Sequence, residues 1–189
     1  MITFTKILAY ELRPLGKDIY EYVAGVASQQ IDPPSLQKSG LVPVASVVLY
    51  SPLKRALECL SKQSGAEYIS MNELAEIPFD LRKMCTEEEW NTQGSVLVRR
   101  KFKEMFVTDT LSIPRVQIFR EVKAVIAQCK EYGTKDIQVV SHSFRLKIIQ
   151  AFIATKGDIE KHPERIGEFI ADDVKTFDFG KGFEVVSLS

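Results

Sequence analysis

The stretch "VVSHSFRLKIIQ", Val139 to Gln150, runs from apolar β-branched residues through Ser-His-Ser into a pattern typical of a helix. A second stretch, "VVLYSPLKRALECL" (47–60), has the same form: a short apolar run, a serine and then an amphipathic helical pattern. Continuous apolar runs are typical of strands that are covered on both faces of a sheet. The two stretches therefore predict buried parallel strands, each followed directly by a helix.

Outward from these junctions, candidate strands alternate with amphipathic stretches along the chain. Strands are predicted at 2–10, 44–50, 66–70 and 136–141, and helices at 16–30, 51–65, 115–133 and 144–157. Such alternation is typical of crossover units that build a parallel sheet with helices on its faces. We therefore expect an α/β fold: a three-layer α/β/α sandwich around a central, mostly parallel sheet.

Some details of these elements are more specific. Ser51 is predicted to cap the helix that follows it, and Thr86 with Glu89 resembles a capping box in a region, 71–94, that is otherwise expected to be mostly irregular. The tail, 174–189, is predicted to form two strands around its glycines. The helix at 115–133 is predicted to bury one apolar stripe, formed by Val116, Phe119, Val122, Val125, Ile126 and Cys129.

Length and composition restrict the class of protein. The 189 residues contain no repeat, low-complexity tract or linker, so we expect one domain, 1–189. Lys plus Arg and Asp plus Glu both number 25, and this zero net charge argues against a nucleic-acid-binding surface. Three widely spaced cysteines suggest no metal site and a reduced, cytoplasmic setting. No apolar run is long enough for a membrane span, the amino terminus is unlike a signal peptide, and no cofactor is expected.

Polar residues at the two junctions are candidates for binding an anion. Ligands of open α/β sheets bind beyond the carboxyl ends of the strands, where helix amino termini favour negative charge. Arg55 lies in the first predicted turn of one helix, and His142 lies in the other strand-to-helix turn, between Ser141 and Ser143. Plainer interpretations exist for each: a surface arginine, a hydrogen-bonded structural histidine and helix-capping serines. The matching positions of these residues at two junctions favour a shared site.

The same residues resemble the histidine phosphatase superfamily, which includes the phosphoglycerate mutases. "VVLYSPLKRALECL" is similar to that family's strand–Ser-x-x-x-Arg-Ala segment, which implies that Arg55 binds phosphate. "VVSHSFRLKIIQAFI" resembles the segment of the second active-site histidine, which would be His142. "ELAEIPFDLRKMCTEEEW" resembles the Leu-x-Glu-Ile-x-Phe-Gly region, so that Glu76 matches the proton donor although Asp80 replaces the glycine. The helix that contains Arg120 also matches. The resemblance implies a phosphoglycerate mutase-like sandwich.

One motif of the family is missing. Its first strand ends in Arg-His-Gly, whose histidine is the nucleophile, whereas this chain has Tyr10, Glu11 and Leu12 at the corresponding place. A carboxylate there would repel phosphate, although Arg13 nearby is a candidate to restore one positive charge. The other histidine, His162, lies in a loop-like stretch far from the first strand and is expected on the surface.

The leading hypothesis is a degenerate histidine phosphatase with a residual phosphate- or anion-binding cleft and little or no activity. Its catalytic remnants would be His142 and Glu76, and its phosphate ligands Arg55, Arg13, Ser51 and Ser143. The partner would be a small phosphorylated or anionic ligand, or a protein. The alternative is an active phosphoric-ester hydrolase or mutase-like enzyme that uses His142 and Glu76 with a non-standard nucleophile. An unrelated Rossmann-like domain would need a glycine-rich loop that "ELRPLG" (11–16) lacks.

These hypotheses make geometric predictions. The strands at 44–50 and 136–141 should be neighbours, with Arg55 and His142 side by side at their carboxyl ends. Glu76 should lie on a loop over the same place, close enough to contact Arg55 or His142 directly or through water.

Overall fold

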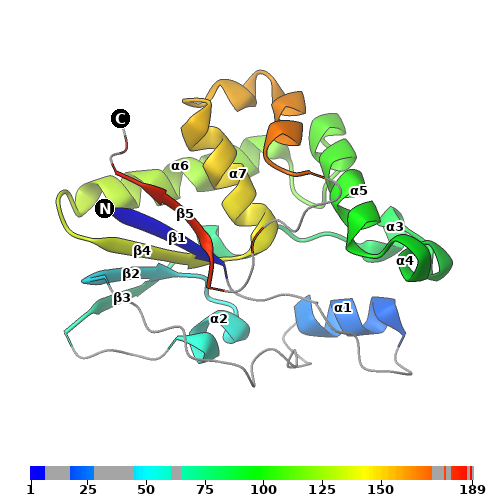
Figure 1. Cartoon of the computed structure of the whole chain (residues 1–189), viewed down its shortest axis with the longest axis horizontal. Helices are drawn as coiled ribbons and strands as arrows, with labels where there is room; N and C mark the ends of the chain where they lie inside the picture. Colours follow the sequence, from blue (N-terminus) through cyan, green and yellow to red (C-terminus); the bar gives the residue numbers. More distant parts are fainter. Residues whose placement is uncertain are drawn as a thin grey trace.

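The computed structural model describes residues 1–6, 18–27, 45–60, 65–171, 177, 180–186 and 188. In chain order these residues form β1 (Ile2–Lys6), α1 (Ile19–Ala27), β2 (Val47–Tyr50), α2 (Lys54–Cys59), β3 (Glu67–Ser70), the 3₁₀ turn η2 (Asn72–Leu74), α3 (Leu81–Met84), α4 (Glu87–Gln93), α5 (Ser95–Thr108), α6 (Arg115–Glu131), β4 (Ile137–Ser141), α7 (Ser143–Ala154), the 3₁₀ turns η3 (Asp158–Glu160) and η4 (Pro163–Glu168), and β5 (Gly182–Val185) (Figure 1).

The described strands form one mixed sheet in the order β3-β2-β4-β1-β5. The first four strands in this order are mutually parallel, and only β5, at the edge, runs antiparallel to its neighbour β1. Strands β2 and β4 pair in register from Val47 opposite Ile137 to Tyr50 opposite Val140. The predicted α/β class with a mostly parallel central sheet is confirmed, and so is the predicted adjacency of these two strands.

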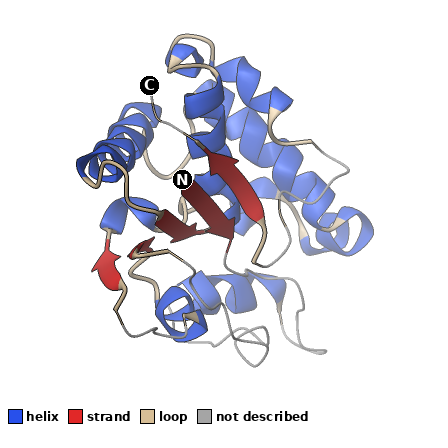
Figure 2. Ribbon diagram, turned by 60° about the vertical axis from the view of Figure 1, so that its left-hand side comes forward, coloured by secondary structure: helices blue, strands red, loops and turns tan. Residues whose placement is uncertain are grey.

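Helices cover both faces of the sheet, with α6 and α7 on one side and α2 on the other (Figures 1 and 2). Successive strand residues point to opposite faces, so a strand between two layers must be apolar at nearly every position. Leu49 and Val139 accordingly join the larger core under α6 and α7, while Val48 and Val140 pack on Ala56 of α2. These contacts explain the continuous apolar runs in the sequence.

Helix α6 contributes the predicted stripe with one exception. Phe119, Val122, Val125 and Cys129 are buried and Ile126 is partly buried, and Ile118 is buried with them. Val116, however, is 77% exposed, so its predicted place in the stripe is wrong. It is the second residue of the helix, where its side chain points to solvent rather than toward the sheet.

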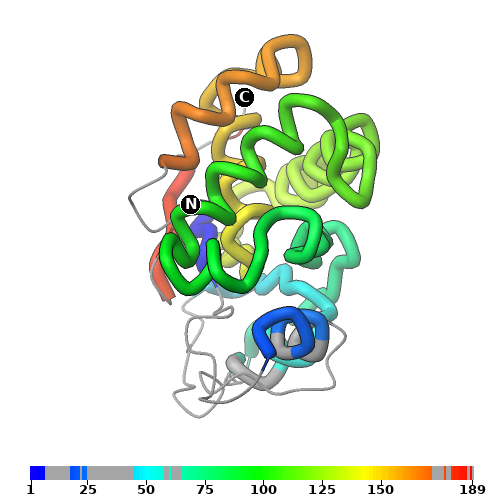
Figure 3. Tube along the Cα trace, turned by 90° about the vertical axis from the view of Figure 1, so that its right-hand side faces the viewer, coloured from blue at the N-terminus to red at the C-terminus, as the bar shows by residue number. Residues whose placement is uncertain are grey.

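The region between β3 and α6 is more helical than expected. Residues 71–94, predicted to be mostly irregular, contain η2, α3 and α4, and α5 follows them from Ser95 to Thr108. The capping box at the start of α4 is confirmed: the Glu89 N–H donates to Thr86 Oγ1 (3.2 Å), and the Thr86 N–H donates to Glu89 Oε2 (2.8 Å). Helix α5 packs against the turn η4, which lies beside it in Figure 3.

Two other predicted segments lie only partly within the described residues. Strand β1 occupies the first part of the predicted 2–10, of which residues 7–10 lie outside the described chain. In the tail, β5 is the strand that the described residues form, and 174–176 and 178–179 are not among them. None of the helices in the described ranges is both long and apolar enough to cross a membrane.

Candidate functional site

The candidate site lies where β2 and β4 end. Both strands run in the same direction, so their carboxyl ends share one edge of the sheet. Ser51 follows β2 directly and leads toward α2, while His142 follows β4 and stands at the N-cap position of α7. The two junctions that look alike in the sequence are therefore next to each other in space.

Arg55 and His142 meet at this edge, as predicted, and Ser51 joins them. The Arg55 Nη2 atom lies 3.2 Å from His142 Nδ1, and His142 Nε2 lies 2.8 Å from Ser51 Oγ. A guanidinium can only donate, so Nδ1 accepts from Arg55, and Nε2 carries the proton that is donated to Ser51. His142 is fully buried and Arg55 is 3% exposed. The imidazole is thereby held in one neutral tautomer.

Electrostatics reinforce that neutral state. Burial lowers the pKa of His142 well below the usual value of 6.5, and the positive charges of Arg55 and Arg145 lower it further. A protonated ring would have to place a third cation among these groups in a region that excludes water. The ring of His142 is consequently neutral at pH 7.

The structure corrects the role predicted for Ser51. Helix α2 begins at Lys54, its N-cap residue is Leu53, and no side chain caps it. The Ser51 hydroxyl accepts instead from His142 Nε2 and, at 3.3 Å, from the Leu53 N–H. The reason is position: Ser51 stands three residues before the helix, so that its hydroxyl reaches the imidazole. Ser143 is the first residue of α7 and is partly exposed.

Glu76 lies on a loop beside the start of α7. Its Oε1 atom accepts from the N–H of Arg145 and from its own neighbour Ile77, each at 3.1 Å. Burial raises the pKa of the Glu76 carboxyl, although these hydrogen bonds and the charges of Arg55 and Arg145 act in the opposite direction. The charge of Arg55 therefore acts on Glu76, while the hydrogen bonds of Glu76 go to main-chain N–H groups. The predicted contact of Glu76 with Arg55 or His142, direct or through water, stays a prediction.

Arg145 is the residue of this region that sequence reasoning missed. Its side chain is 2% exposed; Nε donates to the Ala75 carbonyl (2.9 Å), and Nη2 donates to Glu121 Oε2 on α6 (2.7 Å). Its spacing from His142 could have identified Arg145 as a candidate site residue, because residues three apart share one side of a helix. Arg120, singled out from the same segment as Glu121, is exposed. We call Ser51, Arg55, Glu76, Glu121, His142 and Arg145 the junction cluster.

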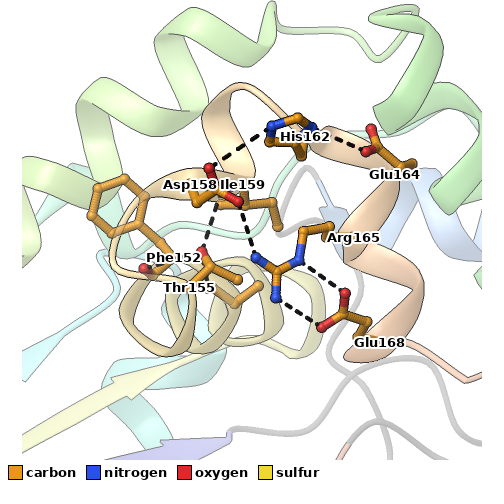
Figure 4. Close-up of polar contacts among 9 residues, drawn as sticks. Phe152, Thr155, Asp158, Ile159, His162, Glu164, Arg165 and Glu168 are labelled. Carbon is orange, nitrogen blue, oxygen red and sulfur yellow. Dashed lines mark hydrogen bonds and ion pairs between the residues drawn. The ribbon is translucent and has the colours of Figure 1, made fainter.

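One predicted phosphate ligand, Arg13, lies outside the described residues, as do Tyr10, Glu11 and Leu12. His162 lies on the surface, as expected: its ring contacts Asp158 (3.9 Å) and Glu164 (3.4 Å), which are near it in sequence (Figure 4). These contacts are solvent-exposed and contribute little to stability.

The junction cluster combines chemistry suited to an anion. It contains two buried guanidiniums, a neutral imidazole, a serine hydroxyl and the amino terminus of a 12-residue helix. Its acidic members are Glu121, paired with Arg145, and Glu76, whose pKa is raised. Within the described ranges, no group of three or more His, Cys, Asp or Glu side chains is arranged to hold a metal ion. N–H donors of this kind can hold an oxyanion.

Comparisons with known proteins leave this site without an assigned family. No family model matches the chain, and no curated protein matches it significantly. Among solved structures, it is similar to the crystal structure of a mutant phosphoserine phosphatase from Entamoeba histolytica in complex with phosphoserine. The TM-score is 0.41 and the identity 17%, over 89% of this chain and 84% of the other. A likeness this distant assigns neither a family nor an activity, so the α/β class rests on the sheet itself.

Proposed function

We propose that the chain is a histidine-phosphatase-like domain that binds a small phosphorylated or otherwise anionic ligand at the junction cluster and hydrolyses phosphate esters slowly or not at all. The observation that carries this proposal is the hydrogen-bonded pair of Arg55 and His142 at the shared carboxyl edge of β2 and β4. The order and spacing of the residues in the resemblance to the histidine phosphatases support it as well.

Charge and position favour an anion as the ligand. Guanidiniums are costly to bury, and they are retained where carboxylates or other oxyanions pair with them. Beside Arg55 and Arg145, the amino terminus of α7 adds the positive end of a helix dipole. The anionic group can belong to a small phosphorylated molecule or to a side chain of a protein partner, and the small molecule is the simpler probe.

The lack of a nucleophile favours slow turnover. A phosphohistidine intermediate needs an imidazole nitrogen with a free lone pair in line with phosphorus. In His142, Nδ1 accepts from Arg55 and Nε2 carries the proton donated to Ser51. The place of the family's nucleophile is taken by Tyr-Glu-Leu at 10–12. At the position of the family's nucleophile, the chain therefore has no histidine to begin the two-step covalent route.

One observation favours the alternative, an active phosphoric-ester hydrolase that uses His142 and Glu76. Burial raises the pKa of Glu76, and a carboxyl that stays protonated nearer neutral pH can protonate a leaving group. Water would then have to attack phosphorus, with Arg55 and Arg145 stabilising the charge. This route differs from the leading proposal in requiring both Glu76 and His142 for turnover.

Two assays separate these possibilities. Hydrolysis of para-nitrophenyl phosphate between pH 5 and 8 is expected to stay near background for the unmodified chain and to be unchanged in His142→Ala. Turnover that is well above background and disappears in both His142→Ala and Glu76→Gln would replace the proposal with the active hydrolase.

Binding is measured separately by calorimetric titration with inorganic phosphate. We expect binding by the unmodified chain that is at least about tenfold weaker in Arg55→Met, a loss of about 1.4 kcal/mol. The matched control is Arg120→Met, which removes the same charge from an exposed position on α6 and should bind normally. Absence of phosphate binding by the unmodified chain would refute the proposed function.

A further inference from the structure

We propose that Arg145 is a second anion-binding residue of the junction cluster, which donates from its Nη1 atom to the same oxyanion that Arg55 binds. This inference rests on the proposed function and adds to it a residue that the resemblance to the histidine phosphatases does not supply. It assigns the ligand's anionic group a place between the ends of β2 and β4 and the first turn of α7.

The first observation is how completely Arg145 is enclosed. It heads the fully buried side chains when these are ranked by volume, and it belongs to the first turn of α7, where its own N–H donates to Glu76. Its Nε and Nη2 atoms are bonded to the Ala75 carbonyl and to Glu121. The plane of the guanidinium is thus fixed by two bonds from two different elements.

The second observation is that the third nitrogen is not used. Nη1 is buried and has no hydrogen-bond partner in the part of the chain that the structure describes. A buried donor without a partner costs free energy. Nε and Nη2 alone already join α7 to the Ala75 loop and to α6, so the joining of these elements does not account for the unused Nη1. Because the guanidinium is rigid and its other nitrogens are bound, the position of Nη1 is fixed in advance of any ligand.

The third observation places this donor near the candidate site. Arg145 lies in the first turn of α7, three residues after His142, and its N–H donates to Glu76 at 3.1 Å. Its charge also lowers the pKa of both His142 and Glu76. Arg55 acts on the same two groups. Two guanidiniums that both act on one imidazole and one carboxyl are suited to a tetrahedral oxyanion, to which arginine donates in a planar fork.

The acidic groups of the cluster do not serve Nη1. Glu121 pairs with Nη2 of Arg145, at 2.7 Å, and Glu76 accepts from the main-chain N–H groups of Arg145 and Ile77. A bound phosphate would supply the acceptor that Nη1 lacks among the described residues.

The test compares two buried arginines. Arg145→Lys keeps the positive charge but loses the fork, and Arg99→Lys makes the same change at a buried arginine of α5 that donates to Ser95. In calorimetric titrations with inorganic phosphate at pH 7, we expect Arg145→Lys to bind at least about tenfold more weakly than the unmodified chain. Arg99→Lys is expected to stay within about twofold, a difference of roughly 0.4 kcal/mol.

A measurement on the unmodified chain tests the inference without depending on whether the variant folds. The nitrogen-15 resonances of the Arg145 guanidinium should shift during a phosphate titration, in step with those of Arg55. If phosphate shifts the Arg55 resonances but not those of Arg145, or if Arg145→Lys folds and binds normally, the inference is overturned and the proposed function stands.

The reverse pattern is equally informative. Weaker binding in Arg145→Lys but not in Arg55→Met would keep Arg145 as an anion ligand and overturn the proposed site at the Arg55–His142 pair. No binding by the unmodified chain would overturn both.

Discussion

Both ring nitrogens of His142 are occupied by side chains of its own fold, Ser51 on one side and Arg55 on the other. This is the bonding of a structural histidine, the plainer of the interpretations that its sequence context allows. It is compatible with a role in ligand binding, because a neutral ring fixes the Arg55 guanidinium at the sheet edge without adding charge. One imidazole thus determines how its neighbours are oriented.

The buried state of His142 predicts a pH dependence of stability. The folded-state pKa is depressed, so the unfolded chain, with an ordinary pKa near 6.5, binds a proton that the folded chain does not. Stability from this group is therefore fully present above pH 6.5 and is lost as pH falls below it, by up to about 1.4 kcal/mol per pH unit.

The free energy of urea unfolding between pH 5 and 8 tests this. The unmodified chain should lose stability relative to His142→Gln as the pH falls through 6.5, because glutamine does not titrate. A difference between the two proteins that is constant over this range would show that the ring is protonated equally in both states.

At the scale of elements, β5 depends on a glycine. A Cβ at Gly182 would lie 1.7 Å from the Phe4 carbonyl oxygen, so β5 can pair with β1 only if this residue has no side chain. Gly182→Ala should therefore push β5 away from β1 and lower the free energy of unfolding by about 3 kcal/mol, the upper end of ordinary single-site effects. Urea unfolding measures the loss.

The control for this substitution is Gly167→Ala, where a Cβ would meet no atom within 4 Å and the backbone is not left-handed. It should change stability by no more than about 0.5 kcal/mol. Equal stability of the two variants would mean that β5 shifts without loss.

The capping box of α4 gives a second test at this scale. Thr86→Ala removes the acceptor for the Glu89 N–H and should cost about 1 kcal/mol in urea unfolding. Thr92→Ala is the matched control, because the Thr92 hydroxyl only bonds back to the Glu88 carbonyl of the same helix. A loss as large in Thr92→Ala as in Thr86→Ala would contradict a specific capping effect.

The elements show which features a sequence can predict. The junctions at Ser51 and His142 were predictable because an apolar strand and an amphipathic helix each carry their own pattern of spacing. The burial of Arg145 was not, because a charged residue in a helical pattern is normally solvent-facing. Only the folded chain brings the Ala75 carbonyl and Glu121 to it. The predicted burial of Val116 was wrong for the opposite reason, since an apolar residue at a helix end need not face the core.

At the scale of the whole molecule, we predict one cooperative unit over residues 1–189. Strand β1 pairs with β4, and β4 pairs with β2, so elements from both halves of the chain share one sheet. Urea unfolding followed by the fluorescence of the single tryptophan, Trp90, and by far-ultraviolet circular dichroism should give coincident transitions. Two separated transitions would indicate more than one domain.

The position of β1 between β4 and β5 has a consequence for the nascent chain. The ribosome makes β1 before either neighbour, and more than a hundred residues separate Lys6 from Ile137. At about 5–20 residues per second, translation of that interval takes on the order of 10 s. Throughout it, Ile2 and Phe4 lack the strands that bury them in the finished sheet. Slowing translation after β1 should therefore lengthen its exposure to chaperones and proteases, whereas the same delay after β5 should not.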